Sequence, residues 1–177
     1  MAFTLAGAGC HRAAPRSETV PVNIGLSGFY EDTAGATLAE PAGSQTFNLQ
    51  TPGQRDSLHA QIKRQREMWR AGGAPDYHFL LRTSCFCPGQ RGWVLVEVRA
   101  GQVVRVWDRG GKPAPLNERD NYSIDGLFDL LEQQADRNDV VAVGFEDRWH
   151  YPAYIRTDAR LGLPDDWGIV EARGFRP

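Results

Sequence analysis

The residues best suited to chemistry in this chain are two cysteines, Cys85 and Cys87, which are followed by Pro88 and Gly89. Two thiols in this spacing can form a cystine, exchange disulfides or hold a soft metal ion. On a regular strand they share a face but lie farther apart than the roughly 3.8 Å between β-carbons that a disulfide requires. A cystine therefore needs a bend, which the proline and glycine favour. We expect a structural cystine that secures the end of a strand.

Two other interpretations of Cys85 and Cys87 stay open. One is a reduced pair that is buried as two small apolar side chains. The other is a redox-active or metal-binding pair completed by His78 or His150, which would make this a thiol-disulfide or metal-handling protein. In the expected strand, His78 falls on the face opposite Cys85, which argues against its joining the thiols.

The third cysteine, Cys10, directly follows residues 1–9, which are apolar and rich in small side chains. This pattern is typical of the end of a bacterial lipoprotein signal peptide, where the cysteine becomes lipidated. The match lacks a positively charged start, and Gly7 stands where leucine is usual, so a flexible N-terminus with an incidental cysteine is the alternative. We expect a lipid anchor at Cys10, which would leave the other two cysteines as a pair in an oxidising compartment.

Other chemistry is poorly supported by the sequence. No nucleotide-binding glycine pattern, nucleophile elbow or metalloprotease motif is present. The four histidines fall in different expected elements, and solvated turns explain the acidic residues better than a calcium loop does. We therefore expect no catalytic residue, no metal and no cofactor. The acidic residues in question are Glu118, Asp120, Glu146, Asp147, Asp158, Asp165 and Asp166.

The overall charge argues against binding to nucleic acid, and the hydropathy argues against a membrane-spanning helix. The chain has 20 basic and 22 acidic residues, a formal net charge of −2, and both signs are interspersed. Such a balance does not predict binding to nucleic acid. No run approaches the ~20 apolar residues of a membrane span, so a membrane contact would depend on the lipid at Cys10.

Hydrophobic periodicity divides the chain into three parts: residues 1–10 as a signal-peptide remnant, 11–50 as a flexible tether, and 51–177 as one domain. Residues 46–50 alternate like a short strand that docks on the domain. A helix is expected over 54–70, because Thr51-Pro52 is a start signal and Gly72-Gly73 ends it.

The elements that must position these residues are two helices and six strands. The second helix begins near Ser123, a good N-cap, and has an apolar stripe that includes Leu127 and Leu131. The order helix, three strands, helix, three strands predicts an α+β fold of two αβββ units, with an antiparallel sheet and both helices on one face. The strands are expected at residues 77–85, 93–99, 103–107, 140–145, 153–158 and 168–172.

The second and third strands read as a hairpin that turns at Ala100-Gly101. Its register stays open, because either Val104 with Val106 or Val103 with Trp107 can point inward.

If the tyrosine, phenylalanine and valine side chains face the helices, an apolar cluster lies on the other face of the sheet. Its members are Leu80, Trp93 and Leu95, with Arg82 beside them. An apolar group rimmed by arginine on an uncovered face is typical of a protein-binding surface. The alternative is that residues 47–49 fold back and cover it.

With these elements in place, the chain resembles an uncharacterised bacterial family, domain of unknown function 6174. The resemblance covers roughly residues 58–170 and implies a secreted or lipid-anchored envelope protein, with no activity assigned. The family more often has glycine before the tyrosine where this chain has His150, which leaves the turn geometry open there. The matching residues are Tyr77-x-Phe79, Cys85-x-Cys87-Pro88, Val96-x-Val98-x-x-Gly101-x-Val103, Leu127-Phe128, Val141-x-Val143 and Tyr151-Pro152-x-x-Ile155-x-x-Asp158.

The sequence thus favours a non-catalytic binding domain in the bacterial cell envelope. We expect it to be lipid-anchored through Cys10 on the periplasmic or extracellular side, or else secreted, and to bind a protein partner in the envelope or a small ligand. The alternative function is thiol-disulfide or metal handling at Cys85 and Cys87.

Overall fold

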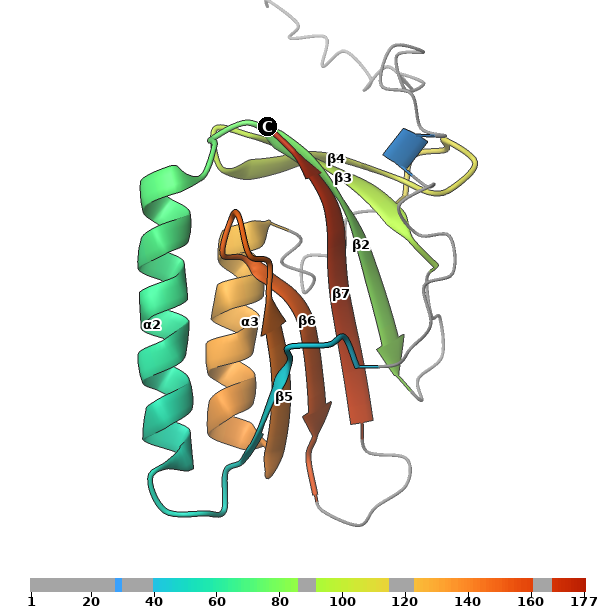
Figure 1. Ribbon diagram of the computed structural model, residues 1–177. Coiled ribbons are helices and arrows are strands. Elements are labelled where there is room, and N and C mark those ends of the chain that lie inside the picture. The colour runs from blue at the N-terminus through green and yellow to red at the C-terminus, as the bar shows by residue number, and fades with distance from the viewer. Residues whose placement is uncertain (1–27, 30–39, 86–91, 115–122, 161–166) are drawn as a thin grey trace, which may run out of the picture.

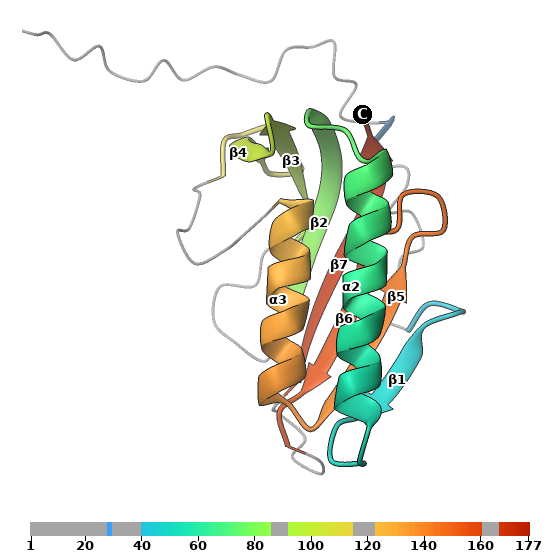
Figure 2. The same cartoon turned by 90° about the vertical axis from the view of Figure 1, so that its left-hand side faces the viewer.

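The computed structural model describes residues 28–29, 40–85, 92–114, 123–160 and 167–177. Within these residues the chain forms two long helices and seven strands. The strands make one antiparallel sheet, and the helices lie side by side on one of its faces (Figures 1 and 2). The predicted α+β class, with an antiparallel sheet and two helices, is confirmed.

The spatial order of the strands is β1-β5-β6-β7-β2-β3-β4, so each run of three consecutive strands stays together. The first strand, β1, pairs with β5 at one edge, as expected for a short docking strand. It precedes residue 51, where the domain was expected to begin, so the sheet includes part of the expected tether. The elements are β1 (Gln45–Asn48), α2 (Gln54–Gly72), β2 (Tyr77–Cys85), β3 (Val94–Arg99), β4 (Gln102–Trp107), α3 (Ile124–Arg137), β5 (Val140–Phe145), β6 (Pro152–Asp158) and β7 (Trp167–Arg176).

The main core lies between the helices and the sheet. Alternate residues of β2 and β3 enter it, because successive strand side chains point to opposite faces. The apolar stripes of both helices pack against them, with Phe128 and Leu131 of α3 fully buried. The strand residues that line this core include Tyr77, Phe79, Leu81, Val94, Val96 and Val98.

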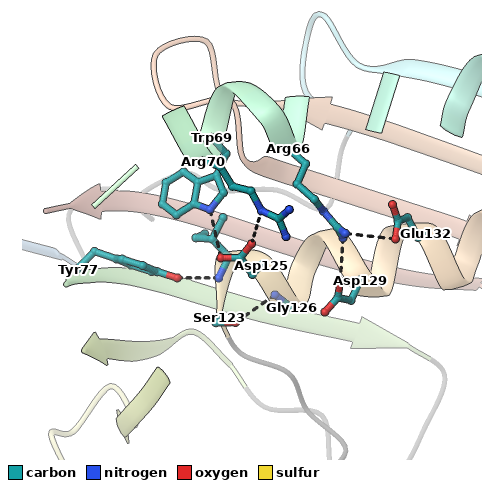
Figure 3. Close-up of polar contacts among 10 residues, drawn as sticks. Arg66, Trp69, Arg70, Tyr77, Ser123, Asp125, Gly126, Asp129 and Glu132 are labelled. Atoms are coloured by element: carbon teal, nitrogen blue, oxygen red, sulfur yellow. Dashed lines mark hydrogen bonds and ion pairs between the residues drawn. The ribbon is translucent and has the colours of Figure 1, made fainter. Parts of the chain in front are cut away.

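The start of α3 is tied to the sheet and to α2 by polar contacts. The Ser123 hydroxyl accepts a hydrogen bond from the Gly126 amide at 3.0 Å, which confirms the expected N-cap. The Tyr77 hydroxyl accepts one from the Ile124 amide at 2.9 Å, and the Trp69 indole donates to Asp125 at 3.4 Å (Figure 3). The contacts of Ser123 and Tyr77 satisfy two amides that a helix start leaves unpaired, and the Trp69 contact joins α2 to α3.

Farther along, the two helices are joined by ion pairs at their solvent edge. Arg66 of α2 contacts Asp129 at 2.9 Å and Glu132 at 3.3 Å (Figure 3). Arg70 contacts Asp125 at 3.5 Å. Because the carboxylates are largely exposed, these pairs set the helices' alignment more than they add to stability.

The hairpin of β3 and β4 has a two-residue turn in which Ala100 (φ 49°) and Gly101 (φ 74°) both have positive φ. Two such residues are typical of a type I′ turn, so the predicted hairpin is confirmed. A bulge opposite Glu97 and Val98 changes the side-chain alternation of β4. Val103 and Val106 therefore face the main core, while Trp107 faces the opposite side. Neither of the two sets expected to point inward, Val104 with Val106 or Val103 with Trp107, is right.

The turn between β5 and β6, whose geometry the sequence left open, has an unusual backbone conformation at His150. His150 has a φ of 63°, in the left-handed region that favours glycine. Its amide donates to the Glu146 carbonyl at 2.8 Å, and the Glu146 side chain accepts from the Arg148 amide at 2.9 Å. These bonds hold the turn although histidine replaces the preferred residue.

Candidate functional site

The face of the sheet turned away from α2 and α3, here called the second face, carries the residues that the sequence singled out. Register places Leu80 beside Leu95 on β3 and beside Arg173 on β7. Two residues on, Arg82 lies beside Glu171 of β7. The side chains of three adjacent strands therefore meet on this face.

A buried carboxylate organises the centre of the second face. Glu171 is only 1% exposed. Its Oε2 accepts a hydrogen bond from Arg82 Nε at 2.6 Å and a second from Arg82 Nη2, and its Oε1 accepts from Arg173 Nη2 at 3.3 Å. A carboxylate removed from water is tolerated only with such charged donors. The hydrogen bonds to Glu171 thereby fix the positions of the Arg82 and Arg173 guanidinium groups.

Trp93 lies against these two arginines. The Arg82 guanidinium carbon is 4.7 Å from the Trp93 ring centroid, and that of Arg173 is 5.7 Å away. Both distances fall within the range of cation–π attraction. Trp93 stays partly exposed, so the site presents an indole ring with two positively charged side chains against it.

The predicted apolar surface is partly wrong. Leu80 and Leu95 are fully buried, so the uncovered cluster expected there does not exist. They pack with Trp107 and with Phe29, which is 3% exposed and reaches them from the N-terminal part of the chain. Only Trp93 and Arg82 of the predicted set remain partly accessible to solvent.

The alternative cover, residues 47–49, is also wrong. Phe47 and Leu49 are buried in the main core on the helix side. Strand β1, which carries Phe47, pairs with β5, and four strands separate it from β3. It therefore lies at the wrong edge and on the wrong face to cover Leu80.

A second buried carboxylate, Glu97, lies near the Phe29 contact. Arg99 Nε is 2.9 Å from its Oε1, and His78 Nε2 is 3.8 Å from the same oxygen. Burial lowers the pKa of His78; the Glu97 carboxylate opposes this shift, and Arg99 adds to it. Neutral His78 can thus pack against the Phe29 ring, whose centroid is 6.2 Å away.

The cysteine predictions stay untested by the geometry. Cys85 is the last residue of β2 and lies opposite Gly168 of β7. It takes part in an interaction with another residue. Cys87 and Cys10 lie outside the described residues, so the expected cystine and the lipid attachment stay predictions. Among the described residues, no group of three or more histidine, cysteine, aspartate or glutamate side chains is arranged to hold a metal ion.

Several residues of this site were missed by sequence reasoning. Glu171 and Arg173 alternate with apolar Val170 and Ala172, a signal that would have placed both charges on one face of the last strand. Phe29 gave no such signal, because it lies in a stretch without periodicity. In the described part of the chain, no helix has the length and hydropathy of a membrane span.

Comparison with known proteins adds the family but no activity. A search of curated proteins and a search of solved structures each found no match. One family model, described as a family of unknown function (DUF6174), matches residues 61–177, which is more than half of the chain and includes every strand of the second face except β1. The chain therefore belongs to the DUF6174 family.

Proposed function

We propose that this domain is a non-catalytic binding module that recognises an acidic segment of a partner polypeptide through the second face. The observation that carries the proposal is Trp93, which is partly exposed beside Arg82 and Arg173. Tryptophan and arginine are the residues most enriched among energetically dominant interface contacts.

The distribution of charge supports an acidic partner. The carboxylate side chains of Glu171 and Glu97 are 1% and 9% exposed, whereas the side chains of Arg173 and Arg99 are 33% and 48% exposed. The charges of Glu171 and Glu97 are thus buried beneath arginines, and the exposed carboxylate at the edge is Asp76, whose side chain is 52% exposed and lies 3.5 Å from Arg99. Each arginine has a carboxylate partner, but around Trp93 the arginine side chains are more exposed than the Glu171 carboxylate that they share. A carboxylate-bearing segment would meet complementary charge here.

Rigidity also favours binding at this place. Both arginines are tied to Glu171 from within the sheet, and their positions fix the indole ring. A preordered contact surface loses little side-chain entropy on association. The site is therefore better suited to recognition than a group of freely rotating surface arginines.

The binding test uses the full-length protein as bait in an extract of its native cell envelope. We expect Trp93→Ala to reduce recovery of the partner at least about ten-fold, since a central aromatic contact contributes about 2 kcal/mol or more. Recovery should also fall as salt is raised, because charge attraction is screened. Met68→Ala is the matched control, since Met68 is exposed on α2. Equal recovery with both variants would refute the proposed surface.

We further propose that the protein is located in the bacterial cell envelope, anchored by a lipid on Cys10, with secretion as the alternative. The support is the apolar, small-residue stretch that ends at this cysteine. Intact mass of membrane-extracted protein, compared with Cys10→Ser, tests the anchor. A mass lacking any lipid increment at Cys10 would exclude it.

A further inference from the structure

Phe29 packs against an apolar cluster from other parts of the chain, and the place that its ring fills is here called the pocket. The pocket floor consists of Leu80, Leu95 and Trp107, from three adjacent strands, and all three are at most 1% exposed. Phe29 belongs to none of the strands of the sheet and precedes β1 by sixteen positions. A side chain from a distant part of the chain thus completes this small core.

The contacts that hold Phe29 are ones that an aromatic residue of a separate peptide can also make. The Arg176 guanidinium carbon lies 3.9 Å from the ring centroid, and Arg176 Nη2 donates a hydrogen bond to the Gly28 carbonyl at 2.9 Å. One arginine therefore contacts both an aromatic side chain and the preceding backbone carbonyl. Neither contact depends on Phe29 being part of the same chain.

The pocket is continuous with the proposed binding surface. Trp93 packs against the cluster that Leu80, Leu95, Trp107 and Phe29 form. A polypeptide with an aromatic residue in the pocket would therefore reach the two arginines around Trp93. The sequence that follows Phe29 is Tyr-Glu-Asp, which combines an aromatic residue with nearby carboxylates.

We propose that this pocket is the docking site for an aromatic side chain of the partner polypeptide, and that Phe29 fills it while no partner is bound. The inference rests on the proposed function and names the chemistry of its ligand: a glycine-aromatic pair with acidic residues close by. Phe29 then acts as an internal competitor, because an occupied pocket must release it before a partner can enter.

The test uses full-length protein and a blocked synthetic peptide with the sequence of residues 24–33. We expect the peptide to bind Phe29→Ala at least about ten-fold more tightly than the wild type, whose own segment has a high effective concentration. Isothermal titration calorimetry gives both constants. A peptide with alanine in place of its phenylalanine is the control and should not bind. Equal affinity for wild type and variant, or no binding to folded variant, would overturn the proposal.

Two further variants keep the outcome decisive. If Phe29→Ala does not fold, Phe29→Leu retains an apolar occupant and should still bind the peptide at least about three-fold more tightly than wild type does. Adding Arg176→Ala to the opened variant should weaken peptide binding, because both arginine contacts are lost. Unchanged affinity would contradict the assignment of this pocket.

The peptide test and the capture test fail separately. Peptide binding to the opened pocket needs no envelope partner, whereas the loss of a captured partner in Trp93→Ala reports on the proposed function itself. A pocket that accepts the peptide while Trp93→Ala still retains its partner would contradict the proposed function alone.

Discussion

On the helix side of the sheet the buried side chains are mainly apolar, whereas the second face buries Glu97 and Glu171 beneath arginines. The ionic groups of the helix side stay at its solvent edge: Asp129, paired with Arg66, is 62% exposed, while Glu171 is 1% exposed. The same kinds of residue therefore serve different purposes on the two sides.

The difference follows from what covers each face. Two amphipathic helices bring enough apolar surface to seal one side, so polar contacts are needed there only at the rim and at the helix start. On the second face, arginine stems, Trp93 and Phe29 form the cover. This cover consists of single side chains, which is what the proposed exchange of Phe29 for a partner side chain requires.

The largest expected effect on stability comes from removing an aromatic ring from the main core, compared with removing one from the second face. Phe128→Ala removes a fully buried ring from the main core and should lower the free energy of unfolding by about 3–5 kcal/mol. Trp93→Ala removes a half-buried ring held by cation–π contacts and should lower it by only about 1–2 kcal/mol. Urea denaturation of both variants measures the two values. Equal losses would mean that Trp93 is core and that the two faces are alike.

A polar atom on the helix side gives the next largest effect, through pH. Burial raises the pKa of Tyr77 to about 12; the hydrogen bond from Ile124 opposes the shift and Asp125 adds to it. Between pH 10 and 12 the unfolded chain loses a proton that the folded chain keeps, so stability should fall as pH rises, by about 2–3 kcal/mol. Thermal unfolding followed against pH should show this slope, and Tyr77→Phe should reduce it, leaving the part that comes from Tyr154, whose pKa burial also raises. A slope that is unchanged in the variant would assign it to another group.

The ionic groups of the two faces can be compared directly. Glu171→Gln keeps the shape but removes the buried charge, and should lower the unfolding free energy by about 2 kcal/mol. Asp129→Asn makes the same chemical change at the exposed rim and should cost less than about 1 kcal/mol. Chemical denaturation at low and high salt gives both numbers. If Asp129→Asn proved the more damaging, the contrast between the faces would be refuted.

The smallest expected effect comes from relieving backbone strain at the turn between β5 and β6, a change that leaves both faces of the sheet unaltered. His150→Gly places glycine at a φ of 63° and should raise the unfolding free energy by about 0.5–1 kcal/mol. His150→Ala keeps the strained conformation and should bring no gain. A differential denaturation measurement that ranks alanine above glycine would show that the turn is not strained.

Local patterns predicted the elements well. The stripe of Leu127 and Leu131 and the cap at Ser123 placed α3, and alternation along β2 assigned Phe79 and Leu80 to opposite faces. These features depend on residues a few positions apart, which is why they can be read without knowing the fold. The turn at Ala100-Gly101 belongs to the same class.

The site was predicted less completely. Arg82 and Trp93 were chosen correctly as neighbours, but Glu171, the carboxylate partner of Arg82, is 89 positions away from it in the chain. The burial of Leu80 and Leu95 was missed for a similar reason, since it depends on which strands are adjacent and on a segment without periodicity.

The sequence by itself determined where helices and strands form and which side of each strand is apolar, because those properties arise from backbone geometry and near neighbours. Only the tertiary structure decided that β7 lies beside β2, that a bulge turns Trp107 to the second face, and that Phe29 closes the pocket there. Those outcomes depend on contacts between distant residues, whose free energies compete across the whole chain and leave no local pattern to read.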